Sequence, residues 1–152
     1  MTKFVFYQLA DNDKVPTLRS IVGKSRERGW RVAIRCSTES EAKAIDDALW
    51  RAPDDGFLPH ARSGSGFDAD QPILIVTDNG ADNRPDALVM LGALELGIGE
   101  LSKLQRVCVL FNGENTEELA SAQLLSKTFR NSGTPVECWV NEHGRWRNRQ
   151  DF

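Results

Sequence analysis

The stretch RVAIRCSTESEAKAIDDALW, residues 31–50, decides the fold because it joins a strand pattern directly to a helix pattern. Residues 31–36 are largely apolar and predict a strand. Thr38 can cap the helix that follows, and Glu41 three residues later completes a capping box. The apolar stripe predicted for this helix consists of Ala42, Ile45, Ala48 and Leu49. The stretch therefore predicts a strand followed by an amphipathic helix that ends at Trp50.

The same alternation continues on both sides of this stretch. Further strands are predicted over residues 4–9, 73–76, 87–91, 107–111 and 136–140, and further helices over residues 15–28 and 115–131. Strands separated by helices imply right-handed crossovers and parallel pairing. The pattern predicts an α/β fold, with a doubly wound, largely parallel, Rossmann-like sheet that carries helices on both faces. One domain is expected over residues 1–152, with a long loop at about 51–71 and a basic C-terminal tail at 145–152.

Composition limits the classes of function. The chain of 152 residues is 40% hydrophobic and 27% charged, as in ordinary globular proteins. Its net charge of −3 argues against an overall electrostatic grip on nucleic acid, although a local basic patch can exist. No signal-peptide pattern and no apolar run long enough to span a membrane occur. Three widely spaced cysteines, Cys36, Cys108 and Cys138, predict reduced, buried thiols in a cytosolic protein.

Motifs for catalysis and for cofactors are weak. Gly23-Lys24-Ser25 resembles the end of a phosphate-binding loop, but it lies inside a predicted helix and Leu18 stands where that motif requires glycine. No C-x-x-C pair occurs, and the two histidines are isolated, so no metal site is predicted. No cofactor site and no catalytic site are expected. The alternative that stays open is a small nucleotide-binding or hydrolytic enzyme that uses Asp11, Asp13 and Asp78 at the carboxyl ends of strands.

Two regions have the composition of protein-binding surfaces. Trp50 and Phe57 flank a Pro- and Asp-containing loop, where they are either interface anchors or plugs at the edge of the sheet. Lys127 and Arg130 lie three residues apart and are neighbours on one helix face. The basic residues further on, interleaved with Trp139 and Trp146, are Arg145, Arg147 and Arg149. A cationic patch beside apolar pockets suits a short acidic peptide with aromatic side chains, or a phosphate backbone.

Several segments, in the same order along the chain, resemble the chi subunit family of bacterial DNA polymerase III. They are Phe6-Tyr7-Gln8-Leu9 followed by Asn12-Asp13, the helix end Ile45-Asp46-Asp47-Ala48-Leu49-Trp50, the element Phe57-Leu58-Pro59-His60, and Lys127-Thr128-Phe129-Arg130. The element around Trp50 and His60 is the most specific of them. The resemblance covers essentially the whole chain and is weak between residues 64 and 106.

The resemblance implies a non-catalytic binding protein in the clamp-loader assembly of the polymerase III holoenzyme. One surface would bind the acidic, Phe-terminated C-terminal tail of single-stranded DNA-binding protein through Lys127 and Arg130, with Phe129 as apolar support. A second surface would bind the psi subunit, or a helicase or another clamp-loader component where psi is missing. The residues that match this second surface are Trp50, Phe57, Pro59 and His60. Contact with DNA would be indirect; the alternative is direct binding of single strands by the C-terminal arginines.

Overall fold

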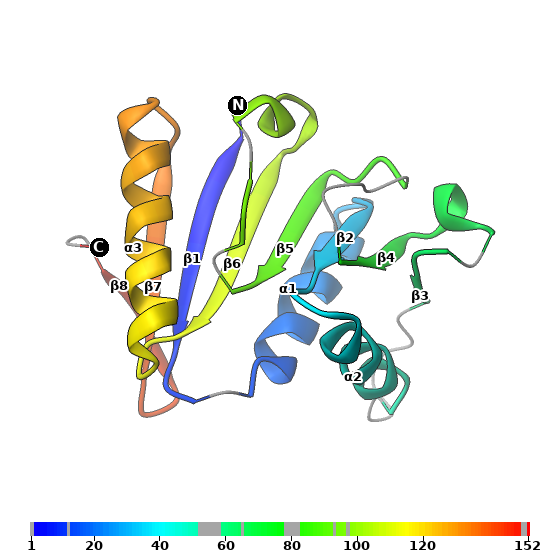
Figure 1. Ribbon diagram of the computed structural model, residues 1–152, viewed down its shortest axis with the longest axis horizontal. Helices are drawn as coiled ribbons and strands as arrows, with labels where there is room; N and C mark the ends of the chain where they lie inside the picture. Colours follow the sequence, from blue (N-terminus) through cyan, green and yellow to red (C-terminus); the bar gives the residue numbers. More distant parts are fainter. Residues whose placement is uncertain are drawn as a thin grey trace. The chain divides into compact units, whose positions relative to one another are not determined.

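The computed structural model describes residues 2–11, 13–51, 59–64, 66–77, 83–92, 94–96, 98–149 and 152 (Figure 1). It separates into two compact units. The first unit comprises residues 1–14 and 90–152, and the second comprises residues 15–89. In each unit parallel strands are joined by helices, which confirms the predicted α/β, Rossmann-like class. Among the described residues, no helix is both long and apolar enough to cross a membrane.

The first unit has the strand order β5-β6-β1-β7-β8. These strands are β1 (Lys3–Leu9), β5 (Ala87–Leu91, shared by the two units), β6 (Arg106–Asn112), β7 (Val136–Glu142) and β8 (Arg145–Arg149). β1 pairs in parallel with both β6 and β7. Helix α3 (Thr116–Asn131) connects β6 to β7 and packs against both strands (Figure 1). A short 3₁₀ helix, η2 (Ile98–Lys103), precedes β6.

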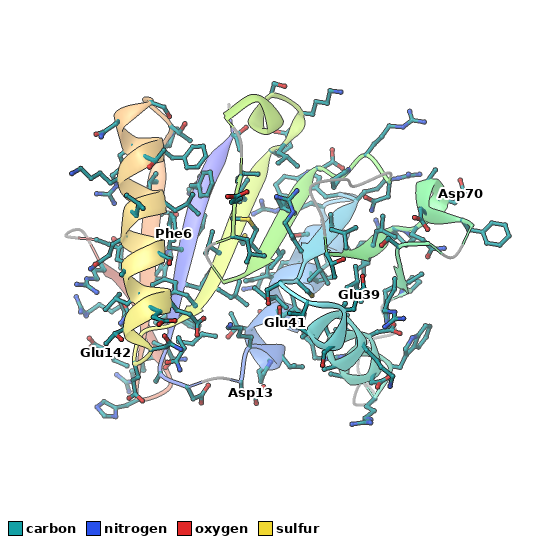
Figure 2. All side chains as sticks on the ribbon, in the orientation of Figure 1. Phe6, Asp13, Glu39, Glu41, Asp70 and Glu142 are labelled. Carbon is teal, nitrogen blue, oxygen red and sulfur yellow. The ribbon has the colours of Figure 1, made fainter. Side chains whose placement is uncertain are left out.

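Residues 145–149 of the expected basic tail form β8, which pairs antiparallel with β7. His143 and Gly144 between the two strands both have positive φ angles, of 53° and 81°, as a two-residue hairpin turn requires. The Gly144 amide donates to Asn141 Oδ1 at 3.0 Å. Figure 2 shows Glu142 at this end of the hairpin, where its carboxylate accepts a 2.9 Å hydrogen bond from Arg147. The charged segment is therefore an ordered edge strand.

The second unit has the strand order β3-β4-β2-β5. Its elements are α1 (Val15–Glu27), β2 (Val32–Arg35), α2 (Glu39–Trp50), β3 (Ala61–Arg62), the 3₁₀ helix η1 (Asp68–Asp70) and β4 (Ile73–Val76). β2 and β3 both pair in parallel with β4. The region expected as a loop at 51–71 thus contains β3 and η1 in its described part, and β3 adds a strand to the edge of the sheet.

Helix α2 begins as its sequence predicts. Thr38 Oγ1 accepts a hydrogen bond from the Glu41 amide at 3.1 Å, and Glu41 Oε1 accepts one from the Ser37 amide at 2.9 Å. Figure 2 shows Glu39 and Glu41 together at this end of the helix. Negatively charged carboxylates at a helix N-terminus interact favourably with the positive end of the helix dipole. Of the predicted stripe, Ala42, Ile45 and Leu49 are buried and Ala48 is half-buried.

All three cysteines are buried, as the sequence predicts. Burial of Cys108 in β6 raises the pKa of its thiol to about 12. In the unfolded chain this thiol titrates near its ordinary value of 9.0, so above that pH the unfolded state loses a proton that the folded state keeps. Stability is therefore fully present below about pH 9 and falls as pH rises toward 12, by up to about 1.4 kcal/mol per pH unit.

This dependence is measurable by urea unfolding between about pH 8 and about pH 10.5. The wild type should lose stability across this interval more steeply than Cys108→Ala, whose absolute stability is lower because of the missing thiol but whose curve against pH is flatter. Every other titratable group is the same in both proteins and cancels in the comparison. Equal slopes for the two proteins would contradict the assignment to Cys108.

Candidate protein-binding surfaces

The end of α2 presents a tryptophan that rests on a histidine. Trp50, the last residue of the helix, is 54% exposed. Its ring lies 4.3 Å from the His60 ring, measured between centroids, at an interplanar angle of 36°. Pro59, which directly precedes His60 in the sequence, is exposed, and Phe57 lies outside the described residues. Trp50 is therefore an accessible aromatic group and not a plug at the sheet edge. We call Trp50, Pro59 and His60 the α2 surface.

His60 positions Trp50 and is not itself accessible. Its side chain is completely buried, and Nε2 lies 3.1 Å from Asp46 Oδ1 and 3.2 Å from the main-chain oxygen of Asp46. Both neighbours accept hydrogen bonds, so Nε2 carries a proton and donates it to Asp46. These contacts connect His60, which follows the loop, to Asp46 in α2, one turn before Trp50. Trp50 is thus held on a rigid base, which lowers the entropic cost of binding a partner.

A hollow of about 410 Å³ adjoins the α2 surface. It is lined by Asp46, Trp50, His60, Ala61, Arg62, Ser63 and Gly64. The Gly64 amide donates to both carboxylate oxygens of Asp68, at 3.1 and 2.9 Å, which fixes that wall of the hollow. The hollow has one aromatic wall, and its opposite side is polar. Such a hollow suits an apolar side chain of a partner protein that has polar groups next to it.

The outer side of α3 carries the predicted cations. Lys127 and Arg130 are exposed, and among the described residues neither has a carboxylate at ion-pair distance. Leu124, three residues before Lys127, is a large apolar side chain that is 67% exposed. The i, i+3, i+6 spacing places the three side chains in a row on one face. We call Leu124, Lys127 and Arg130 the α3 surface.

Phe129 lies on the opposite side of α3, in the core. It is 1% exposed, and its ring stacks on that of Phe4 in β1 with the centroids 4.4 Å apart. Ala122 and Ser126 are buried on the same side of the helix. A ligand on the α3 surface cannot contact Phe129, so any support that Phe129 gives is through the position of the helix.

The arginines of β8 are largely engaged within the first unit. Arg147 bonds to Glu142, and this contact lowers the pKa of the Glu142 carboxyl. Arg149 donates to Gln8 Oε1 at 3.0 Å and lies over the Phe152 ring, 5.7 Å from its centroid. Arg145 is exposed, and it forms no ion pair with any described residue. A nucleic-acid surface built on all three arginines would have to share the guanidinium groups of Arg147 and Arg149 with these contacts.

The groups expected for an alternative enzyme do not form a cluster in the described part of the chain. The Asp13 amide donates to Asp11 Oδ1 at 2.9 Å in an exposed turn after β1, and Figure 2 shows Asp13 at that turn. Asp78 lies outside the described residues. Gly23 to Ser25 lie within α1, where Ser25 Oγ donates to the Ile21 carbonyl. Among the described residues, no three His, Cys, Asp or Glu side chains are placed to hold a metal ion.

Comparison with known proteins identifies a family over most of the chain. The model of the family described as DNA polymerase III chi subunit, HolC, matches residues 1–137. DNA polymerase III subunit chi of Escherichia coli strain K12 is 31% identical over 99 residues, which cover 60% of this chain and 67% of the relative. The Pseudomonas aeruginosa strain PAO1 protein of the same name is 26% identical over 95 residues, covering 60% and 65%. The matches thus span about two thirds of these relatives.

A solved structure supports the fold alone. The C-terminal domain of the DEAD-box protein Dbp5 superposes with a TM-score of 0.60 and covers 90% of each chain at 12% sequence identity. At that identity the similarity concerns the α/β architecture.

β8 and most of β7 lie beyond the residues that the family model matches.

Proposed function

Because the chain belongs to the DNA polymerase III chi subunit family, we propose that it is a non-catalytic accessory subunit of the bacterial polymerase III holoenzyme. In this role it links the clamp loader and the polymerase to single-stranded DNA-binding protein during DNA replication. The observation that carries the proposal is the α3 surface, where two cations without ion pairs to any described residue lie in a row with an exposed leucine. An acidic peptide that ends in phenylalanine complements both properties, charge and apolar area.

The expected affinity follows from the size of this surface. One helix face with two cations and one leucine supports micromolar binding, roughly −8 kcal/mol. Each charge-assisted hydrogen bond contributes on the order of 1.5–3 kcal/mol, and apolar contact with Leu124 supplies part of the remainder. Because the cations are exposed, salt screens them, and the affinity should fall as the ionic strength rises.

The test is a titration of the whole chain with a fluorescent peptide that copies the C-terminal tail of single-stranded DNA-binding protein. Micromolar binding at low salt, weakened by salt and by removal of the terminal phenylalanine from the peptide, is the expected result. Absence of binding at low salt would contradict tail recognition, whichever variants are compared later. A peptide of the same charge with scrambled order measures the purely electrostatic part.

The α2 surface is proposed to bind the psi subunit or, where psi is missing, a helicase or another clamp-loader component. A half-exposed tryptophan on a rigid base beside a hollow has the properties of an interface hot spot. Trp50→Ala should weaken this complex by at least about 2 kcal/mol, or roughly 30-fold, because it removes the anchor and one wall of the hollow.

Calorimetry with the psi subunit or helicase of the same organism measures this effect. Trp146→Ala is the matched control, because Trp146 is also a partly exposed tryptophan, on β8, where its ring packs edge-on against Tyr7. Loss of affinity in both variants, or in neither, would place the interface elsewhere. The tail-peptide titration should be the same for Trp50→Ala and the wild type.

A further inference from the structure

A dense group of cations surrounds the turn between α1 and β2 in the second unit. Residues 24–31 and 83–86 contain five basic and two acidic side chains, in a chain whose net charge is −3. The basic residues are Lys24, Arg26, Arg28, Arg31 and Arg84, and the acidic ones are Glu27 and Asp86. The two segments are adjacent because the amides of Asp86 and Ala87 both donate to the Arg31 carbonyl. We call these residues, with Trp30, the α1–β2 surface.

Two of the five cations hold the surface together. Arg26 Nη1 donates to the Trp30 carbonyl at 2.8 Å. Arg31 Nη1 donates to the carbonyls of Ala69 and Asn83, at 2.6 and 3.1 Å. Asn83 is completely buried, and its amide nitrogen donates to the carbonyls of Val32 and Gln71, each at 3.0 Å. The turn is therefore rigid before any ligand arrives.

The other three cations extend from this base. Lys24, Arg28 and Arg84 are exposed, and none has an ion pair with a carboxylate in the part of the chain that the structure describes. Lys24 and Arg28 lie on the same side because the Arg28 amide donates to the Lys24 carbonyl. Arg84 is held at a φ of 49°, a left-handed conformation that is uncommon for arginine.

An aromatic ring lies within this group of cations. The Arg28 guanidinium lies over the Trp30 ring, 5.0 Å from its centroid, and Trp30 is half-buried. A guanidinium above an indole ring places a positive charge beside an aromatic surface. Nucleobases stack on guanidinium planes and on aromatic rings, while neighbouring cations contact the phosphates on either side.

We propose that the α1–β2 surface binds single-stranded nucleic acid directly, with bases on the Arg28–Trp30 pair and phosphates on Lys24, Arg28 and Arg84. An acidic protein segment fits less well, because recognition of a peptide also needs an apolar anchor point. The exposed large apolar side chains among the described residues all lie elsewhere, at Trp50, Phe67, Leu124 and Trp146. This function is independent of tail recognition and adds a direct contact where the family resemblance implies only an indirect one.

The salt dependence of oligonucleotide binding provides a quantitative test of the proposal. Each phosphate contact with a single strand contributes about −0.7 to the slope of log affinity against log salt concentration, so three contacts predict a slope of about −2. Lys24→Ala/Arg28→Ala should reduce the slope to about −0.7 and weaken binding at low salt by at least about tenfold. Loss of stacking in Trp30→Leu should weaken binding roughly 5- to 150-fold, whereas Trp30→Phe should retain it.

The experiment is fluorescence anisotropy of a labelled oligothymidylate of about 20 nucleotides with the whole chain. Lys43→Ala/Lys103→Ala, which removes the same charge from exposed positions elsewhere, is the matched control. Equal loss in both double variants, or an unchanged Lys24→Ala/Arg28→Ala variant, would overturn the proposal. So would polyglutamate that competes with the oligonucleotide at equal charge concentration. Lys24 and Arg28 are exposed, so the double variant decides the question even where Trp30→Leu fails to fold.

The same double variant separates this proposal from tail recognition. Lys24→Ala/Arg28→Ala should bind the tail peptide as the wild type does. If it loses the peptide together with the oligonucleotide, the α1–β2 surface is a general anion site, and the assignment to nucleic acid is wrong. If the wild type binds the oligonucleotide but no tail peptide, the direct contact stands and the tail proposal alone fails.

Discussion

Lys127→Ala/Arg130→Ala is expected to weaken binding of the tail peptide by roughly 100-fold or more. Each substitution removes a charge-assisted contact on the order of 1.5–3 kcal/mol, and about 1.4 kcal/mol corresponds to a factor of ten. The two cations are neighbours and share one acidic ligand, so the combined loss need not equal the sum of the single losses. The measurement is the same peptide titration, repeated at several salt concentrations. The dependence on salt should flatten in the variant because the screened contacts are gone.

The structure supplies the controls for this variant. Both side chains are exposed without ion pairs to described residues, so the melting temperature should stay near that of the wild type. Lys43→Ala/Lys103→Ala removes equal charge outside the α3 surface and should keep the affinity. Leu124→Ala should keep the fold and lose affinity for peptides with a terminal phenylalanine only. Retained micromolar binding by Lys127→Ala/Arg130→Ala would place the tail site elsewhere on the chain.

Phe129→Ala is expected to lower the free energy of unfolding by about 3–5 kcal/mol. The phenyl ring is 1% exposed and stacks on Phe4, so its removal leaves a cavity between α3 and β1. This loss is a large part of the total stability of a domain of this size. Urea unfolding measures it, and an unchanged m-value would show that the denatured state is unaffected.

The Phe129→Leu variant distinguishes a structural role of Phe129 in the core from direct contact of Phe129 with the peptide. Leucine fills most of the same volume, so this variant should stay folded, with a loss smaller than that of Phe129→Ala. Since Phe129 lies beneath the helix and away from the α3 surface, the folded variant should bind the tail peptide within about threefold of the wild type. A folded Phe129→Leu protein without peptide affinity would show that the ligand reaches the core side of α3.

Most of the fold could be predicted from the sequence because the apolar runs and helix-capping residues in the sequence agree with the burial and the helix start in the structure. The apolar runs that became β4 and β6 are almost wholly buried, and the capping pair Thr38 and Glu41 marks the start of α2 within one residue. β8 was missed for a physical reason. Its residues are mostly arginine, and its ordering depends on a two-residue turn at His143 and Gly144 and on pairing with β7. Tertiary pairing overrides composition at such an edge.

The candidate binding surfaces were predictable in part. Helical spacing places Lys127 and Arg130 together, and the same spacing assigns Leu124 to their face, three residues earlier and off the buried stripe. Exposure of Trp50 could not be predicted, because an aromatic residue at a helix end is compatible with either environment. The role of His60 was also hidden. The sequence predicts His60 as a residue that contacts the partner. In the folded chain its Nε2 lies next to Asp46, fourteen residues earlier, and the buried His60 ring supports Trp50.

The burial of all three thiols makes the chain a convenient carrier for a single spectroscopic label. A maleimide dye reacts with thiolates that solvent can reach, and Cys36, Cys108 and Cys138 are all shielded in the folded protein. Ser121 is exposed on α3, three residues before Leu124. In Ser121→Cys the dye would attach at that position alone. Its emission would then report the arrival and departure of a ligand on α3 in real time, without a mutation in the native cysteines.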